Sequence, residues 1–465
     1  MTLFESVKEC GSDALVIAAM ESTDRQAIDP VWLDDKDKII EPAFADYFLL
    51  SHPMKCVHGR LYTVDGLIED ETPLKREIYN MIRGYVRSNI ARKTDMLLQT
   101  IRLACASDPP ELQTDRIHVA NGTYFINGTF HTEKEYCMNR LPVEYRQDAP
   151  TPERWMKFLN ELLNEKDILT LQEYIGYCLL PVTKAQKMLL IVGKGGEGKS
   201  RIGLVLRELL GDSLYTGSLQ KIETNRFARA DLEFKLALVD DDMKMEALPQ
   251  TSTIKTLVTL EDRIDVERKG QQSVPGVIYA RFIGFGNGGL HALYDKSNGF
   301  YRRQLLLVTK EKPADRKDDP YLIDKLRTEK DGIFQWALEG LHRLIANDYQ
   351  FTISEQAAGN LREAMEQGNN ILSFLRSEEY FEIRPGASCK STDFYKCYER
   401  WCADNMEKKF AAATFLHYLK ENQKTLGILY DERCVGRCRG FHNVDLHPFI
   451  PVREPTPFDN IGNSG

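Results

Sequence analysis

The feature that most constrains this chain is a glycine-rich loop between an apolar run and a helix-forming segment. Residues 188–192 (Met-Leu-Leu-Ile-Val) are continuously apolar, which is typical of a strand buried on both faces of a parallel sheet. Residues 193–200 (GKGGEGKS) follow and match the pattern G-x-x-x-x-G-K-[S/T]. The amphipathic segment 200–210 then ends at Gly211, a residue type that often closes a helix. This order predicts an α/β fold with an anion-binding loop.

The residue types in the loop suit a nucleoside triphosphate. Glycines let backbone N–H groups fold around phosphate oxygens. We expect Lys199 to reach the β- and γ-phosphates and the Ser200 hydroxyl to ligate Mg²⁺, so ATP and Mg²⁺ are the predicted cofactors. The alternative is a glycine-rich turn that matches by chance, which the flanking strand and helix disfavour. The predicted ATP-binding residues are Gly193, Lys194, Gly195, Gly196, Glu197, Gly198, Lys199 and Ser200.

Three acids follow the next predicted buried strand, at residues 236–239. They are Asp240, Asp241 and Asp242. Because a buried strand that ends in acids places carboxylates beside the metal, we predict Asp240 as a ligand of Mg²⁺ through water. Asp241 is then the base that orients the attacking water. Adjacent acids leave this assignment open by one position, and a solvated acidic turn is the alternative.

Polar residues also stand at the ends of two later predicted strands. Asn287 follows the apolar strand 282–285, and we predict that it positions the lytic water against the γ-phosphate. A turn-forming asparagine is the alternative. Arg302 and Arg303 precede the strand 305–308. An arginine here is predicted to reach the γ-phosphate of a neighbouring subunit, and a solvated surface pair is the alternative.

Residues 262–280 predict a β-hairpin between these motifs. Apolar and polar residues alternate at its start, and its polar middle contains Gly270. Arg268, Lys269 and Gln271 then lie near the tip. A basic tip that projects into the channel of a ring would bind a phosphate backbone without reading bases. An ordinary exposed turn has equal support from this segment alone.

The C-terminal part predicts a winged helix, with three helices followed by short arginine-rich strands. Residues 371–453 hold 13 Lys and Arg against 11 Asp and Glu, in a chain whose net charge is −8. A recognition helix with a basic wing would bind DNA, and a winged helix that contacts protein is the alternative. The predicted DNA-binding residues here are Lys408, Lys409, His417, Lys420, Arg437 and Arg439.

The order of these motifs resembles the superfamily 3 helicases, specifically the phage, plasmid and poxvirus primase–helicase family. The resemblance covers roughly residues 45–450. Besides the motifs above, it rests on Lys255 and Asp262 ahead of Lys269. It also rests on four flanking segments, at residues 143–163, 171–180, 331–344 and 371–402.

The resemblance implies a hexameric AAA+ ring that moves 3′→5′ on single-stranded DNA with ATP. It implies that Lys269 is the channel lysine, Asn287 the sensor and Arg303, beside Arg302, the arginine finger acting in trans. Fewer than ~100 residues precede the stronger part of the resemblance, too few for a primase domain, so we expect no primer synthesis. The predicted domains are a mostly helical N-terminal domain with a short β-hairpin (1–148), the AAA+ P-loop core (149–350), a linker (351–370), a winged-helix domain (371–453) and a flexible tail (454–465).

Charge and composition limit the function classes. A net charge of −8 excludes a generally basic nucleic-acid-binding protein, so any such surface is local. Ten cysteines without framework spacing favour a reduced cytosol. No apolar run reaches the ~18 residues of a membrane span, so we expect no membrane partner. The expected location is the cytoplasm of a bacterial host that carries a prophage or mobile element.

The favoured function is an ATP-dependent DNA helicase that acts as a ring in replication of a prophage or mobile element. Its expected partners are single-stranded or forked DNA, further copies of the chain as a hexamer, and a separate primase or polymerase. Two alternatives stay open: an ATP-regulated initiator that binds an origin, and an AAA+ remodelling ATPase in phage defence.

Overall fold

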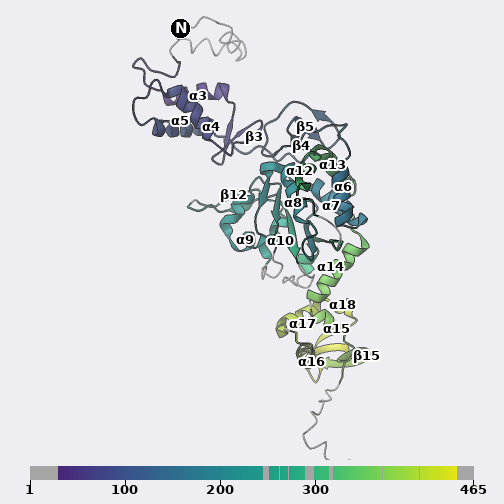
Figure 1. The fold of residues 1–465 in the computed structure, drawn as a ribbon. Coiled ribbons are helices and arrows are strands. Elements are labelled where there is room, and N and C mark those ends of the chain that lie inside the picture. Colours follow the sequence, from purple (N-terminus) through teal and green to yellow (C-terminus); the bar gives the residue numbers. More distant parts are fainter. Residues whose placement is uncertain are drawn as a thin grey trace, which may run out of the picture. The chain divides into compact units, whose positions relative to one another are not determined.

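The computed structural model divides the chain into two compact units, residues 1–144 and 145–465 (Figure 1). It describes residues 30–243, 251–260, 262–270, 272–287, 298–313, 318–368, 370–407 and 409–447. Within these ranges, every helix is too short or too polar to cross a lipid bilayer.

The N-terminal unit combines three described helices with two small sheets. The helices are α3 (Glu41–Ser51), α4 (Thr72–Ile82) and α5 (Ile90–Ala104). The strands are β1 (Lys55–Val57), β2 (Arg60–Thr63) and β3 (Gly66–Leu67) in one sheet, and β4 (Arg116–Val119), β5 (Gly122–Phe125), β6 (Phe130–His131) and β7 (Arg140–Leu141) in the other. The helices share a core that includes the fully buried Phe44, Phe48 and Ile78.

Strands contribute more to this unit than the sequence predicts. The short β-hairpin that the sequence predicts in this unit is present as β4 and β5, which pair antiparallel across a turn at Ala120 and Asn121. The meander β1–β2–β3 is not predicted, because its strands are only two to four residues long. In the described residues the unit therefore contains more strands than the single predicted hairpin.

A five-stranded parallel sheet forms the centre of the second unit. Its order is β14-β8-β13-β10-β9, and all neighbours are parallel. The strands are β8 (Met188–Gly193), β9 (Leu214–Thr216), β10 (Ala237–Asp240), β13 (Arg281–Asn287) and β14 (Gln304–Val308). The mixed α/β class and four of these strands are as predicted. The short strand β9 is the exception, since only three residues form it.

Helices that flank the sheet bury apolar faces and approach one another at glycines. They are α6 (Glu153–Leu162), α7 (Glu165–Tyr177), α8 (Ser200–Leu210), α12 (Leu322–Arg327) and α13 (Lys330–Ala346). A Cβ at Gly176 of α7 would lie 2.4 Å from the Ala337 carbonyl oxygen of α13. A Cβ at Gly340 would likewise lie 2.4 Å from the Gln172 carbonyl. The two helices pack closely because neither position carries a side chain.

Shorter elements connect these parts. They are α9 (Leu219–Thr224), α10 (Ser252–Val258), β11 (Ile264–Val266), β12 (Val274–Gly276), α11 (Asn298–Tyr301) and α14 (Glu355–Gly368). β11 and β12 pair antiparallel, which confirms the predicted hairpin, and Gly270 at its turn has φ +77°. Helix α14 fills most of the segment 351–370, which the sequence predicts as a linker.

The C-terminal part of this unit joins helices to a three-stranded antiparallel sheet of order β15-β17-β16. Its elements are α15 (Asn370–Leu375), β15 (Phe381–Lys390), α16 (Ser391–Asp404), α17 (Ala412–Glu421), α18 (Gln423–Leu426), β16 (Leu429–Val435) and β17 (Cys438–Leu446). Its core includes the fully buried Phe374, Phe394, Phe415 and Phe441. The predicted helices and late strands are present, and β15 is an additional strand.

Candidate functional site

The glycine-rich loop lies at the carboxyl edge of the sheet, between β8 and α8. The next strand in the chain, β9, lies at the far edge of the sheet, whereas β13 and β14 flank β8. β8 is therefore the first strand of this sheet in chain order, and the chain leaves it through the loop and α8. In open parallel sheets, ligands bind outside the carboxyl ends of the strands.

The backbone of the loop needs glycine at specific positions. Gly195, Gly196 and Gly198 have φ values of +108°, +82° and +107°, in the region that side chains rarely adopt. A Cβ at Gly193 would lie 2.2 Å from the Thr309 hydroxyl oxygen. The backbone conformation and the close packing of the loop thus require glycine at these positions, independent of any ligand.

Lys199 and Glu197 form a buried ion pair inside the loop. The Lys199 Nζ atom lies 2.8 Å from Glu197 Oε2, and the two residues are 6% and 3% exposed. Glu197 Oε1 also accepts a hydrogen bond from the Gly195 N–H at 2.8 Å. Burial acts to raise the pKa of Glu197, but the hydrogen bonds from Lys199 and the backbone outweigh it and lower that pKa. The carboxylate therefore stays charged and holds both the lysine and the loop.

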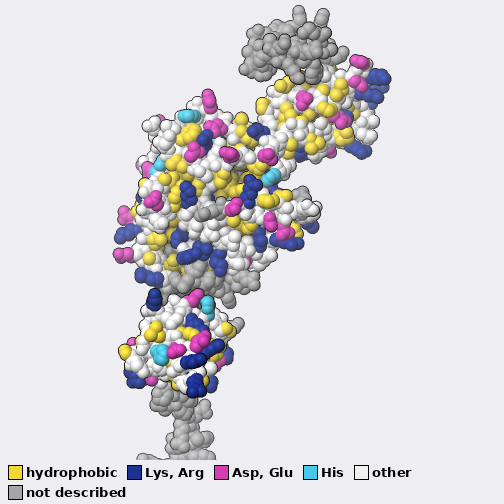
Figure 2. All heavy atoms as spheres, turned by 180° about the vertical axis from the view of Figure 1, so that it is seen from behind, with side chains coloured by type: hydrophobic (Ala, Val, Ile, Leu, Met, Phe, Trp, Pro, Cys, Tyr) yellow, Lys and Arg dark blue, Asp and Glu magenta, His cyan; other side chains and the backbone are white. Residues whose placement is uncertain are grey.

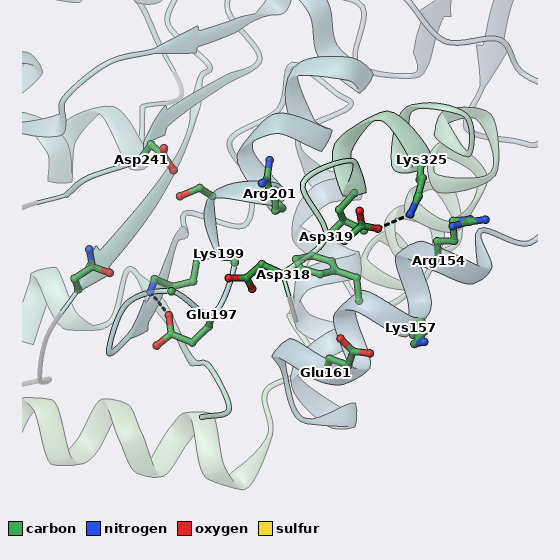
Figure 3. A pocket seen from close by; sticks show the side chains of 16 residues that line it. Arg154, Lys157, Glu161, Glu197, Lys199, Arg201, Asp241, Asp318, Asp319 and Lys325 are labelled. Carbon is green, nitrogen blue, oxygen red and sulfur yellow. Dashed lines mark hydrogen bonds and ion pairs between the residues drawn. The ribbon is translucent and has the colours of Figure 1, made fainter. Parts of the chain in front are cut away.

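A cavity of about 590 Å³ opens beside the loop (Figure 3). Lys199 and Glu197 lie on one side of the view, with Arg154, Lys157 and Lys325 across from them. The cavity is lined by Arg154, Lys157, Phe158, Glu161, Gly196, Glu197, Gly198, Lys199, Ser200, Arg201, Asp241, Asn287, Asp318, Asp319, Leu322 and Lys325. It thus brings four predicted catalytic or metal-binding residues together: Lys199, Ser200, Asp241 and Asn287.

The three adjacent acids have different surroundings. Asp240 is buried at the end of β10, and its Oδ2 accepts a hydrogen bond from the Leu219 N–H at 2.8 Å. Burial raises the pKa of Asp240. Asp241 is exposed and lines the cavity, whereas Asp240 and Asp242 do not line it. The structure therefore places Asp241, rather than the predicted metal ligand Asp240, next to the loop.

Oxygen donors suited to Mg²⁺ are present at this edge. Magnesium in nucleotide sites is held by one or two side-chain oxygens, with phosphate and water oxygens as the other ligands. The Ser200 hydroxyl and the Asp241 carboxylate both line the cavity. The residues present therefore fit a magnesium ion that arrives with a triphosphate.

Asn287 ends β13 directly beside the loop. Its Cα partner on β8 is Gly193, and its Oδ1 lies 3.8 Å from a Cβ constructed on Gly195. The side chain also lines the cavity. The predicted sensor residue is thus adjacent to the glycine-rich loop.

Arg302 and Arg303 lie at the opposite, amino edge of the sheet. The Arg303 carbonyl accepts a hydrogen bond from the Met188 N–H at 2.7 Å, where β8 begins. The six-residue strand β8 separates this point from the loop, a length of about 20 Å. Burial and the neighbouring Arg302 lower the pKa of Arg303. The two arginines are therefore too distant to act in the cavity of their own subunit.

The sequence does not single out the charged residues on the far side of the cavity. Arg154, Lys157, Phe158 and Glu161 of α6 all line it. Their spacing of three, four and seven residues places them on one helical face, which is the signal that identifies them. On α12, Lys325 lines the cavity and lies 2.6 Å from Asp319.

The predicted DNA-binding residues are dispersed over two surfaces. At the β11–β12 turn, Lys269 is exposed, whereas Arg268 forms an ion pair with the largely buried Glu233. In the C-terminal part, where Figure 2 shows Lys and Arg side chains gathered on one face, several of the predicted residues have partners. Lys409 pairs with Glu399 at 2.5 Å, and His417 lies 3.3 Å from Glu421. The Lys420 ammonium lies over the ring of Tyr430. Arg437 and Arg439 are exposed near the β16–β17 turn. Lys408 lies outside the described residues, as does Gln271 of the hairpin.

Two family models match parts of this chain. Residues 57–164 match a family described as D5 N terminal like, and residues 191–303 match a family of unknown function (DUF5906). Both are typical of phage and plasmid primase–helicase-type proteins. The second match begins within β8 and ends at Arg303, so it contains the loop, the acids and Asn287. No curated protein matches the sequence significantly.

Two similar solved structures are apo structures of the NrS-1 C terminal region. Each is 11% identical to this chain and is covered over its full length. They cover 88% and 87% of this chain, with TM-scores of 0.52 and 0.51. At this identity, the likeness shows a shared fold.

Proposed function

We propose that this chain is an ATP-driven DNA helicase of the phage and plasmid primase–helicase type, with an AAA+ P-loop core that acts as a ring. The observation that carries the proposal is the cavity at the carboxyl edge of the sheet. Lysine, serine, aspartate and asparagine side chains from the loop, α8, β10 and β13 meet there. These are the residue types that bind a triphosphate, hold its magnesium and position water.

In this proposal the triphosphate occupies the glycine-rich loop and Lys199 contacts its β- and γ-phosphates. Lys199 starts from its ion pair with Glu197, so phosphate binding shares or replaces that contact. The N-terminus of α8 adds favourable backbone N–H groups. Phe158 and Leu322 provide apolar surface on the far side, which suits a nucleobase.

Asp241 and Ser200 would hold Mg²⁺, which neutralises charge on the phosphates when it is bound. Asp240 has a positioning role in the proposal, since its carboxylate accepts a hydrogen bond from the first residue of α9. Asn287 orients the attacking water from the end of β13. Asp241 is the only one of the three acids that reaches the cavity. It would hold the ion through a bound water, so that its carboxylate can still accept the proton of the attacking water.

The amino-edge arginines support action between subunits. Because β8 separates Arg303 from its own loop by about 20 Å, the finger role requires the cavity of a neighbour. Hydrolysis would then move the β11–β12 hairpin, with exposed Lys269 at its turn, along a phosphate backbone.

The experiment measures ATP hydrolysis with and without single-stranded DNA, together with unwinding of a labelled fork. We expect DNA to stimulate hydrolysis and ATP to drive unwinding. Lys269→Ala should retain basal hydrolysis and lose unwinding, because it lies outside the cavity. An ATPase that does not respond to any nucleic acid would instead favour a protein-remodelling function.

The initiator alternative predicts a different result in a duplex-binding assay. It requires sequence-specific duplex binding that survives Lys199→Ala and disappears when residues 371–465 are deleted. Absence of unwinding together with that pattern would replace the helicase proposal.

A further inference from the structure

Helix α4 of the N-terminal unit carries a cationic stripe with an aromatic residue in its middle. Arg76, Tyr79 and Arg83 are separated by three and four residues, so they share one face at the helical repeat. The buried Ile78 and Ile82 lie on an adjoining face of the helix and enter the core of the unit. All three stripe residues are exposed, Tyr79 at 43%.

Two acids near this stripe have other partners. Glu77, the acid within α4, lies 3.0 Å from His52, and Glu71 pairs with Arg102 of α5. A third acid, Asp70, accepts a hydrogen bond from the Thr72 N–H at 2.9 Å, and Arg76 acts on it only as a weaker charge effect that lowers its pKa. Across the part of the chain that the structure describes, no ion pair involves Arg76 or Arg83. The positive charge of the stripe is therefore available to a ligand.

The surrounding sequence adds to this charge. Residues 72–104 hold seven Lys or Arg against two Asp or Glu, a net charge of +5 in a chain of net charge −8. Arg87 and Arg92, which follow the stripe in the chain, are also exposed. Figure 2 shows Lys and Arg side chains gathered along one edge of the N-terminal unit. Positive charge is thus concentrated in this segment, although the chain as a whole is acidic.

The stripe matches the chemistry of a single nucleic-acid strand. Arg76 and Arg83 are about 10 Å apart along the helix axis, with the Tyr79 ring between them. Proteins that bind single strands combine cations for the phosphates with aromatic rings on which bases stack. Asn80 beside the ring is polar and exposed, and the stripe has no aliphatic residue, which disfavours a membrane or an apolar protein partner.

We propose that α4 is a binding site for single-stranded DNA, with Arg76 and Arg83 on phosphates and Tyr79 stacked on a base. The site is distinct from the β11–β12 hairpin, which belongs to the second unit. It gives the chain a second contact with the strand, outside the machinery that hydrolyses ATP.

The test measures binding of full-length protein to fluorescent oligo(dT) by anisotropy, across a salt series and without ATP. All variants carry Lys269→Ala, which removes the hairpin contribution. Arg76→Gln/Arg83→Gln should weaken binding about tenfold or more and make the slope of log K against log salt shallower by about 1.4, since each phosphate contributes about 0.7. Tyr79→Ala should weaken binding about fivefold or more with an unchanged slope, and Tyr79→Trp should restore it.

The matched control is Lys36→Gln/Lys38→Gln, which removes the same charge from exposed positions of the same unit. It should bind like the Lys269→Ala parent. Basal ATPase activity should be equal in all variants, which shows that the second unit is folded, and an unchanged thermal unfolding profile shows the same for the N-terminal unit. Equal loss in the control, no loss in the stripe variants, or equal competition by duplex DNA would overturn the proposal. A Lys269→Ala parent that hydrolyses ATP but binds no oligo(dT) would overturn it while leaving the ATPase site intact.

Discussion

The cations of the glycine-rich loop and those of helix α4 represent opposite uses of positive charge. Lys199 is 6% exposed and fixed by an ion pair with Glu197 and by the fold around it. Arg76 and Arg83 are exposed, and the nearby Glu71 and Glu77 pair with other residues. A buried, paired charge acts through geometry, whereas an exposed charge acts through a field that salt screens.

Buried and exposed cations should therefore respond differently to substitution. Changes in the cavity should alter catalysis by orders of magnitude and depend little on ionic strength. Changes on α4 should alter DNA binding by smaller factors that depend strongly on salt.

Arg303→Ala tests a third position, half-buried at the amino edge of the sheet. We expect kcat for ATP to fall about 10³-fold, as for loss of an arginine finger, while nucleotide affinity changes little. Mixing this variant with Lys199→Ala protein should restore hydrolysis, because each subunit then supplies the group that the other lacks. Steady-state assays on a mixing series measure this, and a simple dilution of activity would contradict action in trans.

Asp241→Asn tests the cavity acid against its neighbour. We expect hydrolysis to fall about 10²-fold or more, because general-base catalysis contributes about this much, and the requirement for Mg²⁺ to rise. Asp242→Asn is the matched control, since Asp242 is exposed and does not line the cavity. A magnesium titration of the ATPase rate separates the two variants. Equal effects at both positions would remove the distinction between them.

Glu197→Gln tests the ion pair inside the loop. Neutralising this carboxylate removes a negative charge next to the proposed phosphate site, so the Kd for ATP should fall about tenfold. Fluorescent nucleotide binding measures the change, and Glu197→Asp, which keeps the charge, serves as the control. Weaker binding by the Gln variant would mean that Glu197 mainly positions Lys199 for the phosphate.

Ionic strength tests the comparison directly on the parental protein. DNA affinity should fall at least about sevenfold between roughly 50 and 200 mM salt, since two α4 contacts alone account for that factor and the contact of Lys269 adds to it. The basal ATPase rate over the same range should change much less. Parallel titrations of both quantities give the result, and equal sensitivity would show that exposed charge also controls the cavity.

Local patterns in the sequence predict the strands and the loop well. β8, β10, β13 and β14 are apolar on both faces, and the glycine positions have a backbone reason. These features depend on neighbouring residues in the chain. The short strands β1, β2 and β9, and β15 with its register shift between Ile383 and Ser388, form through pairing with distant segments. Local patterns do not contain that information.

The candidate site likewise depends in part on contacts between segments that are distant in the sequence. The sequence places acids after β10, but the choice between Asp240 and Asp241 depends on the Leu219 N–H, which belongs to another element. Arg154, Lys157 and Glu161 enter the cavity because α6 and α12 both border the loop edge. Likewise, the pairing of Arg268 with Glu233 leaves Lys269 as the exposed cation of the turn; the hairpin residues alone do not separate the two, although the family resemblance favours Lys269.

Hydrolysis of ATP by the Lys199→Ala/Glu197→Gln variant shows whether the glycine-rich loop is the catalytic site. The second change avoids an unpaired buried carboxylate, which would itself destabilise the fold. We expect ATP turnover to be lost, with oligo(dT) binding and the unfolding temperature close to those of the parent. Turnover at the parental rate would show that the loop is not the catalytic site.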